Sequence, residues 1–234
     1  MIDRRFASAE EALSDVQDGA TILIGGFGEA GNPTELVHAL IDQGARELTV
    51  VNNNAGNGDI GLARLILKKR VRKMICTFPR ASVGSAFEDL YRAGKIELEL
   101  VPQGTLAERI RAGGAGIPAF YTPTAVGTEL EKGKEKRSFG GRDYLLETAI
   151  NADLALIKAE RADRWGNLTF NKAARNFGPI MAMAAKLTVV QARDLVELGE
   201  IDPEQIVTPS IFVDRVVHVP DPIVESEYLK AQAA

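Results

Sequence analysis

The sequence of 234 residues has few of the side chains that hold metals or form cross-links. Cys76 is the only cysteine, which excludes an intramolecular disulfide and a multi-cysteine metal site. His38 and His218 are the only histidines, and their spacing matches no zinc motif. We therefore expect no metal site.

An excess of positive charge and long apolar runs are also missing. With 28 basic and 32 acidic residues the net charge is −4, which gives no electrostatic reason to bind nucleic acid or an anionic membrane. No apolar run approaches the length of a bilayer span, and the N-terminal segment carries acidic residues instead of the apolar core of a secretory signal. These observations predict a cytoplasmic protein.

What the sequence does contain is a regular series of short apolar segments. Four predicted strands at residues 21–24, 48–51, 71–78 and 96–101 alternate with helical patterns at 33–40, 60–67 and 86–91. Later strands are predicted at residues 144–146, 154–158, 187–191 and 211–219. The alternation predicts an α/β fold with an open, mostly parallel sheet flanked by helices, in one domain over residues 1–234. Residues 117–141 are predicted to be a loop, and residues 225–234 to be frayed or ordered only by a partner.

A glycine motif follows the first predicted strand. Gly26, Gly28 and Gly31 form G-x-G-x-x-G, the dinucleotide fingerprint when it joins a strand to a helix. That fingerprint also needs an acidic residue at the end of the second strand, where this sequence has asparagines at 52–54. The motif alone is weak evidence for NAD binding, and it leaves open a structural turn or an anion-binding loop.

The segments that follow the four early strands are rich in Gly, Asn and Gln and poor in ionisable groups. Ligands of open parallel sheets bind beyond the carboxyl ends of the strands, and neutral amides can orient carboxylates and thioester oxygens. No nucleophile–base pair is found there. The structural alternative is that the asparagines only form a turn, that Gln103 begins a helix, and that Arg109 is solvated.

Several of these segments resemble one known family in the same order along the chain. Residues 18–33, DGATILIGGFGEAGNP, resemble the signature of the family I CoA-transferases, and every defining position is present. Residues 53–56, 97–124, 162–167 and 172–186 resemble the same family, so that the likeness extends from about residue 5 to residue 219.

The resemblance implies the A subunit of a heteromeric 3-oxoacid CoA-transferase, partnered by a B subunit in an A2B2 assembly. It also implies no permanently bound cofactor, with a coenzyme A thioester as a substrate. Such an enzyme moves CoA from succinyl-CoA to a 3-oxoacid through a glutamyl-CoA thioester, and the nucleophilic glutamate is expected on the B subunit, with no catalytic residue in this chain. NNNAGNGDIGLA and DRWGNLTF favour the 3-oxoadipate branch, whereas residues 102–124 are equally similar to the acetoacetate branch. A non-catalytic module of the same fold, binding an anion or a partner, is the alternative.

The resemblance also assigns site residues. It implies that Gln103, Asn53 and Asn54 contact the substrate. The loop that it associates with CoA consists of Gly25, Gly26, Phe27, Gly28, Glu29, Ala30 and Gly31. Whether CoA or the B subunit contacts this loop stays open.

The sequence departs from the family pattern at three places. It has Ala125–Val126 where Gly-Tyr is frequent, Asn171 where an arginine is frequent, and Ser210 where glycine is usual. These departures bear on the identity of the substrate more than on the class of reaction.

Overall fold

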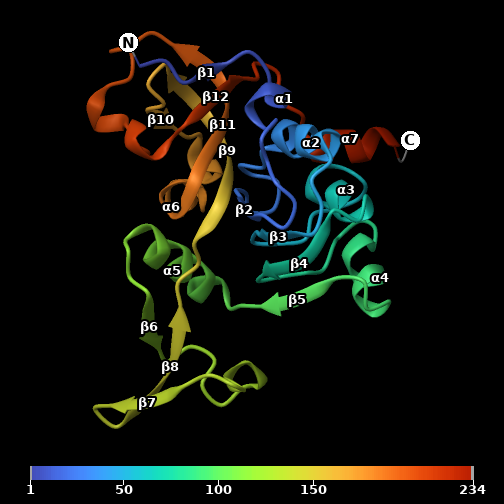
Figure 1. The fold of residues 1–234 in the computed structure, drawn as a ribbon, viewed down its shortest axis with the longest axis vertical. Coiled ribbons are helices and arrows are strands. Elements are labelled where there is room, and N and C mark those ends of the chain that lie inside the picture. The colour runs from blue at the N-terminus through green and yellow to red at the C-terminus, as the bar shows by residue number, and fades with distance from the viewer. Residues whose placement is uncertain (1, 233–234) are drawn as a thin grey trace.

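A computed structural model describes residues 2–232 and shows a nine-stranded sheet with helices on both faces (Figure 1). From one edge to the other its strands are β1 (Arg5–Phe6), β12 (Arg215–His218), β11 (Ala185–Val196), β9 (Ala152–Asp163), β2 (Thr21–Ile24), β3 (Leu48–Val51), β4 (Val71–Cys76) and β5 (Glu97–Leu100). The neighbours along this path are all parallel, and β10 (Leu168–Thr169) pairs antiparallel with β9. The predicted α/β class with a mostly parallel sheet is confirmed.

Helices cover both faces of this sheet because its strands are apolar on both sides. Ile22 and Ile24 pack into one core, whereas Leu23 between them packs into the other. The first core lies under α1 (Ala9–Ala12), α2 (Thr34–Gln43), α3 (Gly61–Leu67) and α4 (Ala86–Arg92), and the second under α5 (Gln103–Gly114) and α6 (Gly178–Ala184). The short helices η2 (Lys172–Arg175), η3 (Pro203–Gln205) and η4 (Ser210–Phe212) and the C-terminal α7 (Glu225–Gln232) complete this body. None of the described helices is long and apolar enough to cross a membrane.

The order of the strands reverses between β2 and β9. From β2 the chain proceeds in one direction through β3, β4 and β5, and from β9 it proceeds in the other direction through β11 and β12. The last ladder bond between the two halves runs from the Gly25 amide to the Leu156 carbonyl at 2.9 Å, and β9 continues beyond it. Ligands of doubly wound sheets bind beyond such a reversal, which here is bordered by the glycine loop.

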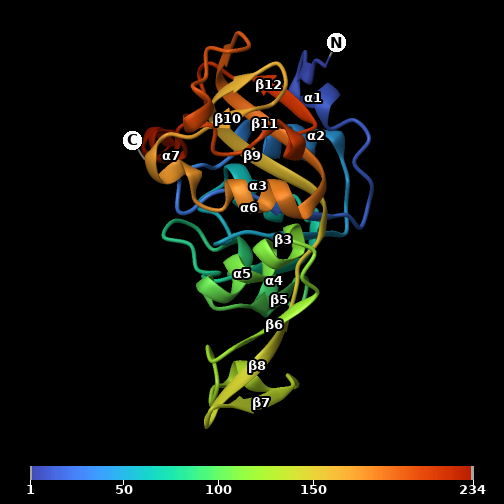
Figure 2. The same ribbon diagram turned by 90° about the vertical axis from the view of Figure 1, so that its left-hand side faces the viewer.

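A second, smaller sheet projects from the body (Figures 1 and 2). It contains β6 (Ala119–Thr122), β8 (Arg142–Thr148) and β7 (Lys136–Phe139), all antiparallel, with η1 (Glu129–Glu131) between β6 and β7. We call residues 119–148 the arm. The prediction of a loop at residues 117–141 is therefore wrong. All four residues of β7 are exposed, so this segment has no apolar alternation that would mark it as a strand.

Candidate functional site

The amide side chains after β3 lie at the carboxyl ends of the large sheet, and two of them stabilise the local chain. The Asn52 side chain donates to the Ile24 carbonyl at 2.7 Å and accepts from the Asn54 amide at 2.8 Å. Asn54 in turn accepts from the Gly56 amide at 2.7 Å. These two asparagines therefore form turns of their own, as the structural alternative predicted.

Asn53 differs from its neighbours because its side chain reaches across the strand ends. It is only 5% exposed, and its amide nitrogen donates to the Thr77 hydroxyl and to the Gln103 side-chain oxygen, both at 3.0 Å. Gln103 is the first residue of α5 and is exposed. The structure therefore brings Asn53 and Gln103 together. We call Asn53, Thr77 and Gln103 the amide cluster.

The amide cluster holds Gln103 in a defined orientation. Its oxygen is occupied by Asn53, and its amide nitrogen donates to no group among residues 2–232. Two N–H bonds thus remain for a ligand beyond the sheet. Within the same range, no carboxylate hydrogen-bonds to Asn53 or Gln103. The arrangement can bind or polarise an oxygen atom, but it supplies no nucleophile of its own.

The glycine loop is built as a tight turn. Phe27 and Ala30 exchange two backbone hydrogen bonds of 3.0 and 3.2 Å, and α2 begins only at Thr34. Gly31 has a φ of +84°, and a Cβ there would lie 2.5 Å from the Ala174 carbonyl oxygen. The third glycine therefore permits a close contact with the chain around η2. It does not open a helix, as the dinucleotide motif requires, because α2 begins three residues later.

Hydrogen bonds attach the loop to the segment before α6. The Asn176 side chain accepts from the Gly26 amide at 3.2 Å and donates to the Ala30 carbonyl at 2.8 Å. As a result Gly25, Gly26 and Gly31 are buried, whereas Phe27, Gly28 and Glu29 are exposed. Only this exposed half of the loop is available to a ligand or to another chain.

The C-terminal segment docks against the glycine loop. The prediction of a frayed end at residues 225–234 is therefore wrong for residues 225–232, and residues 233–234 lie outside the part of the chain that the structure describes. Residues 225–232 form α7. The Glu225 carboxylate is 6% exposed and accepts from the Thr34 hydroxyl at 2.8 Å and from the Asn32 amide at 3.0 Å. The Glu29 carboxylate accepts from the Ser226 amide at 2.9 Å. The hydrogen bonds that hold this segment are made by polar groups. The sequence of the segment therefore has no apolar pattern from which its docking could be predicted.

Burial raises the pKa of Glu225 above its usual range, and the negative charge of Glu29 adds to this effect. The hydrogen bonds from Thr34 and Asn32 and the positive charge of Lys158 oppose it. We call the small space around this carboxylate the carboxylate recess. Its polar lining consists of Asn32, Thr34, Asn52, Asn54 and Glu225, and the rest of its wall is formed by Ile24, Pro33, Val37, Gly56 and Leu62.

Two larger cavities flank α7. One of about 400 Å³ lies beside Gly28 and Glu29 and is closed on the other side by Leu229. The second, of about 490 Å³, lies between the loop and η2 and is lined by Lys158 and Lys172 among others. Neither lysine forms a salt bridge with any residue between 2 and 232. The surroundings of the loop thus offer room and two lysines without a salt-bridge partner among the described residues, although Glu29, Glu160 and Glu225 line the same cavity.

Sequence reasoning missed Asn32, Thr34 and Glu225, and it misplaced Arg109. The Arg109 side chain is buried beside Glu99 at 2.7 Å rather than solvated. The three departures from the family pattern lie away from the amide cluster. Ala125 and Val126 are in the arm, Asn171 lines the second cavity, and the Ser210 amide donates to Asn167 at 3.0 Å.

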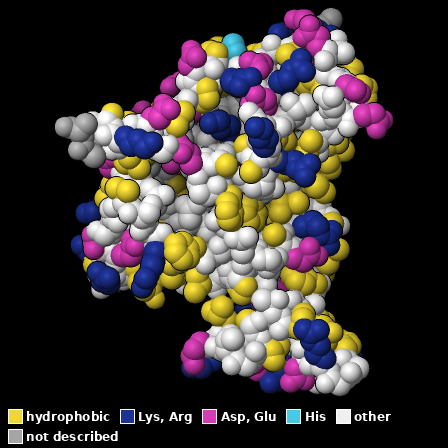
Figure 3. Space-filling model, turned by 180° about the vertical axis from the view of Figure 1, so that it is seen from behind, with side chains coloured by type: hydrophobic (Ala, Val, Ile, Leu, Met, Phe, Trp, Pro, Cys, Tyr) yellow, Lys and Arg dark blue, Asp and Glu magenta, His cyan; other side chains and the backbone are white. Residues whose placement is uncertain are grey.

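The exposed surface beside these strand ends is partly apolar. Phe27, Phe78 and Val83 follow β2 and β4 and are 48%, 61% and 50% exposed. On the face shown in Figure 3, hydrophobic side chains gather across the middle of the molecule, above the arm. Exposed aromatic side chains of this kind are typical of surfaces that meet another chain.

Comparison with known proteins identifies the family and agrees with the fold. The family model described as coenzyme A transferase matches residues 6–219. The chain is 60% identical to the A subunit of the 3-oxoadipate CoA-transferase of Pseudomonas putida, over 94% of this chain and 95% of that protein. It is 52% identical to the A subunit of a probable succinyl-CoA:3-ketoacid coenzyme A transferase of Bacillus subtilis, over 91% of this chain and 88% of that one.

Solved structures show the same architecture. An acyl-CoA transferase from E. coli O157:H7 matches 95% of this chain with a TM-score of 0.83 and 25% identity; this chain spans 50% of the length of that structure. Glutaconate coenzyme A-transferase from Acidaminococcus fermentans matches 93% of this chain, and the match covers 76% of that protein's chain. The TM-score is 0.81 and the identity is 24%, so this likeness supports the fold alone. With the match of the family model over most of its length, the chain belongs to the coenzyme A transferase family.

Proposed function

We propose that this chain is the A subunit of a heteromeric CoA-transferase that moves CoA from succinyl-CoA to 3-oxoadipate. The observation that carries the proposal is the orientation of Gln103 by Asn53, which leaves two N–H donors at a strand end without a carboxylate partner. Relatives at 60% and 59% identity are named as A subunits of 3-oxoadipate CoA-transferases. One A-subunit domain over residues 1–234 and a cytoplasmic location remain predictions.

The nucleophile would be a glutamate of the B subunit. Its carboxylate exchanges with the acyl group of succinyl-CoA to give a glutamyl-CoA thioester and free succinate. The carboxylate of 3-oxoadipate then takes the CoA and restores the glutamate, so that each half-reaction exchanges one thioester for another. Gln103, oriented by Asn53 beneath it, would hold and polarise the reacting carbonyl oxygen with its own N–H bonds, and Asn54 would border the acyl group.

The loop from Gly25 to Gly31 would contact CoA through its exposed half. Phe27 and Gly28 are accessible, and the cavities on either side of the loop have the volume for parts of such a ligand. Lys158 and Lys172 would attract its phosphates, whereas the carboxylate of Glu29 would repel them. The same exposed surface would meet the B subunit, in an assembly that we take to be A2B2.

The test is an assay of CoA transfer from succinyl-CoA to 3-oxoadipate with this chain by itself, with the isolated B subunit, or with the two together. We expect transfer only with the two together, and substantial transfer by the isolated chain would refute the two-subunit proposal. Gln103→Ala should lower kcat roughly 10²-fold, the usual effect of removing one donor to a developing oxyanion. Gln205→Ala, an exposed glutamine of η3, is the control. Equal kcat for both variants would remove Gln103 from the site.

Acetoacetate is the alternative acceptor. It is favoured by relatives at 52% identity that are named as A subunits of succinyl-CoA:3-ketoacid coenzyme A transferases. The ratio of kcat/KM for the two acceptors, measured with the same preparation of the two subunits, decides between them.

A further inference from the structure

The C-terminal segment places a carboxylate in a recess that the rest of the molecule builds. Both donors to Glu225 come from the start of α2, 193 and 191 positions away in the sequence. Thr34 is 1% exposed and Glu225 is 6% exposed, so both groups are out of water. A buried carboxylate is costly unless its surroundings satisfy it. The carboxylate recess is therefore a preformed binding site for a carboxylate group.

Nothing in the recess binds Glu225 as one half of a salt bridge. Its direct partners are a neutral amide and a hydroxyl, and Lys158 contributes only by its charge from nearby. An incoming carboxylate would find the same two donors. It could replace Glu225 without leaving a buried cation unpaired, which makes exchange much easier than at a buried ion pair.

The segment that supplies Glu225 is weakly attached. α7 has eight residues, and Glu225 is the only one of them that is buried. A helix of this length is marginal in water by itself. Two further hydrogen bonds hold the segment, which the Ser226 amide donates to Glu29 and the Ile223 amide donates to Glu35. The half-buried Leu229 also packs beside Gly58. These contacts are exposed or half-buried, so the segment can leave without disturbing the core.

We propose that Asn32 and Thr34 form the subsite for the second carboxylate of a dicarboxylic acyl group, and that Glu225 occupies it until such a group displaces α7. This inference rests on the proposed function, because succinyl and 3-oxoadipyl groups carry a free carboxylate and an acetoacetyl group does not. Asn54 lines the recess and directly follows Asn53 of the amide cluster. The subsite therefore adjoins the place where the thioester would react, and it selects for dicarboxylic acyl groups.

The test measures binding of succinate to the full chain by isothermal titration calorimetry. Glu225→Ala should bind succinate at least about tenfold more tightly than the wild type, because the recess is no longer occupied by the chain itself. Glu227→Ala is the matched control, since it removes the same charge from an exposed position of the same helix. Adding Thr34→Val to Glu225→Ala should abolish the gain, because valine keeps the shape of threonine and removes the hydroxyl.

Three results would overturn the proposal: no gain for Glu225→Ala, an equal gain for Glu227→Ala, or a gain that survives Thr34→Val. A second measurement needs no variant, in case Glu225→Ala folds poorly. Saturating succinate should speed hydrogen exchange at the amides of residues 226–232 in the wild type, because succinate displaces α7. Unchanged exchange at these amides would also refute the subsite.

Failure of the subsite and failure of the proposed function are distinguishable. The binding and exchange measurements need no B subunit, whereas the transfer assay does. CoA transfer by the two subunits, combined with no effect of Glu225→Ala on succinate binding, would keep the proposed function and refute the subsite. Tighter succinate binding by Glu225→Ala in a chain that transfers no CoA would keep the subsite for dicarboxylates and refute the enzyme.

Discussion

The large sheet and the arm are both sheets, yet different forces stabilise them. In the large sheet, β3 is buried along all four residues, and apolar cores lie on both faces. In the arm, β7 is exposed along all four residues, and Leu145 is the one described apolar side chain that is fully buried. Burial of apolar area is the main stabilising contribution to a fold, so the large sheet should be far more stable than the arm.

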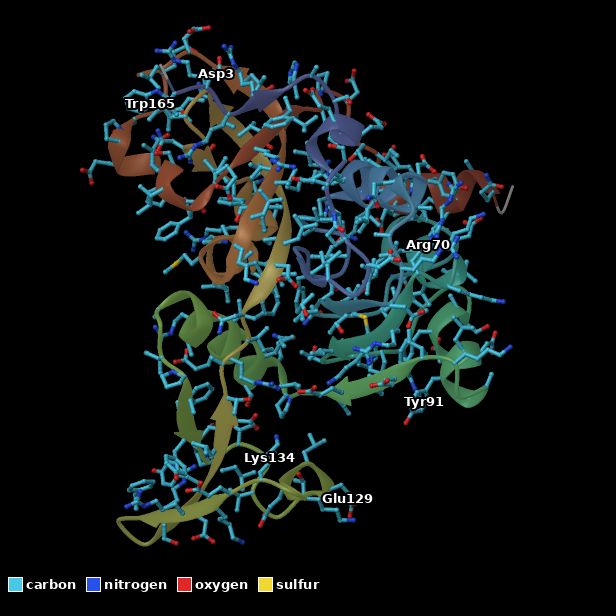
Figure 4. The ribbon with its side chains drawn as sticks, viewed as in Figure 1. Asp3, Arg70, Tyr91, Glu129, Lys134 and Trp165 are labelled. Atoms are coloured by element: carbon cyan, nitrogen blue, oxygen red, sulfur yellow. The ribbon has the colours of Figure 1, made fainter. Side chains whose placement is uncertain are left out.

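The arm depends instead on aromatic and charged contacts. The Phe139 ring lies 5.2 Å from Tyr121 and 5.5 Å from Tyr144, both edge-to-face. Lys134 pairs with Glu147, and Figure 4 shows Lys134 and Glu129 on the projecting part of the chain. The amide cluster and the carboxylate recess therefore rest on the rigid part of the molecule, and the arm can change without moving them.

The largest expected effect comes from truncating the core of the large sheet. Leu156 is 0% exposed in β9, and Leu156→Ala should lower the free energy of unfolding by about 2–5 kcal/mol. Phe139→Ala in the arm is the comparison, because this ring is 43% exposed, and it should cost roughly 1 kcal/mol. Urea denaturation measures both. Equal losses would show that the arm and the large sheet unfold as one cooperative unit of similar stability.

The second effect concerns the junction of the two sheets. The Arg109 guanidinium contacts Glu99 at 2.7 Å and donates to the Thr148 carbonyl at 2.7 Å, and Glu147 lies 3.9 Å away. Arg109→Met should cost about 2 kcal/mol, because it removes a charge-assisted hydrogen bond to Glu99 and a hydrogen bond to the Thr148 carbonyl. It should also make the arm more sensitive to limited proteolysis.

Arg111→Met is the control for this variant. Arg111 lies on the same helix, is 45% exposed and pairs with Glu108 at the surface. We expect no measurable change in stability or in proteolysis. If the arm of the Arg109→Met protein stays as resistant to protease as the wild type, contacts other than this junction hold the arm in place.

The same contrast explains what the sequence could predict. The strands β2 and β3 were predicted with their observed bounds, because a buried parallel strand needs an apolar run and turns at both ends. Apart from the strand predicted at residues 144–146, the arm was not predicted, because its strand β7 is exposed and has no apolar alternation. The burial of Arg109 and the docking of Glu225 were not predicted either, because they depend on polar partners at other places in the chain. Nothing local distinguishes Arg109, which reaches Glu99 and Thr148, from the solvated Arg111. In the site, the family resemblance placed Asn53 and Gln103 in the same cleft, but the hydrogen bond between them was not predicted.

A third prediction uses pH to probe the interior of the large sheet. Burial raises the pKa of the Cys76 thiol from 9.0 to about 12, against a weaker opposing effect of a backbone hydrogen bond at Phe78. The unfolded chain therefore loses this proton first as pH rises. The contribution of Cys76 to stability is complete below pH 9.0 and is lost progressively between pH 9.0 and about 12. The loss should approach about 1.4 kcal/mol for each pH unit.

Cys76→Ala is the reference that isolates this effect, because lysines and tyrosines titrate equally in both proteins. The difference in unfolding free energy between the wild type and Cys76→Ala should be constant up to about pH 9 and then shrink. A difference that stays constant through about pH 11 would mean that the thiolate is tolerated inside the sheet, and hence that water reaches it.

The smallest effect is expected from the charges of the arm itself. Lys136 lies 2.7 Å from Glu131, and this positive charge holds the pKa of Glu131 below its usual range. Both side chains are in contact with water, so salt should screen the pair almost completely. Lys136→Ala should therefore shift the unfolding midpoint slightly at about 0.01 M salt, and not at all at about 1 M. A shift that persists at high salt would show that Lys136 stabilises the arm through contacts that salt does not screen, such as packing of its aliphatic chain.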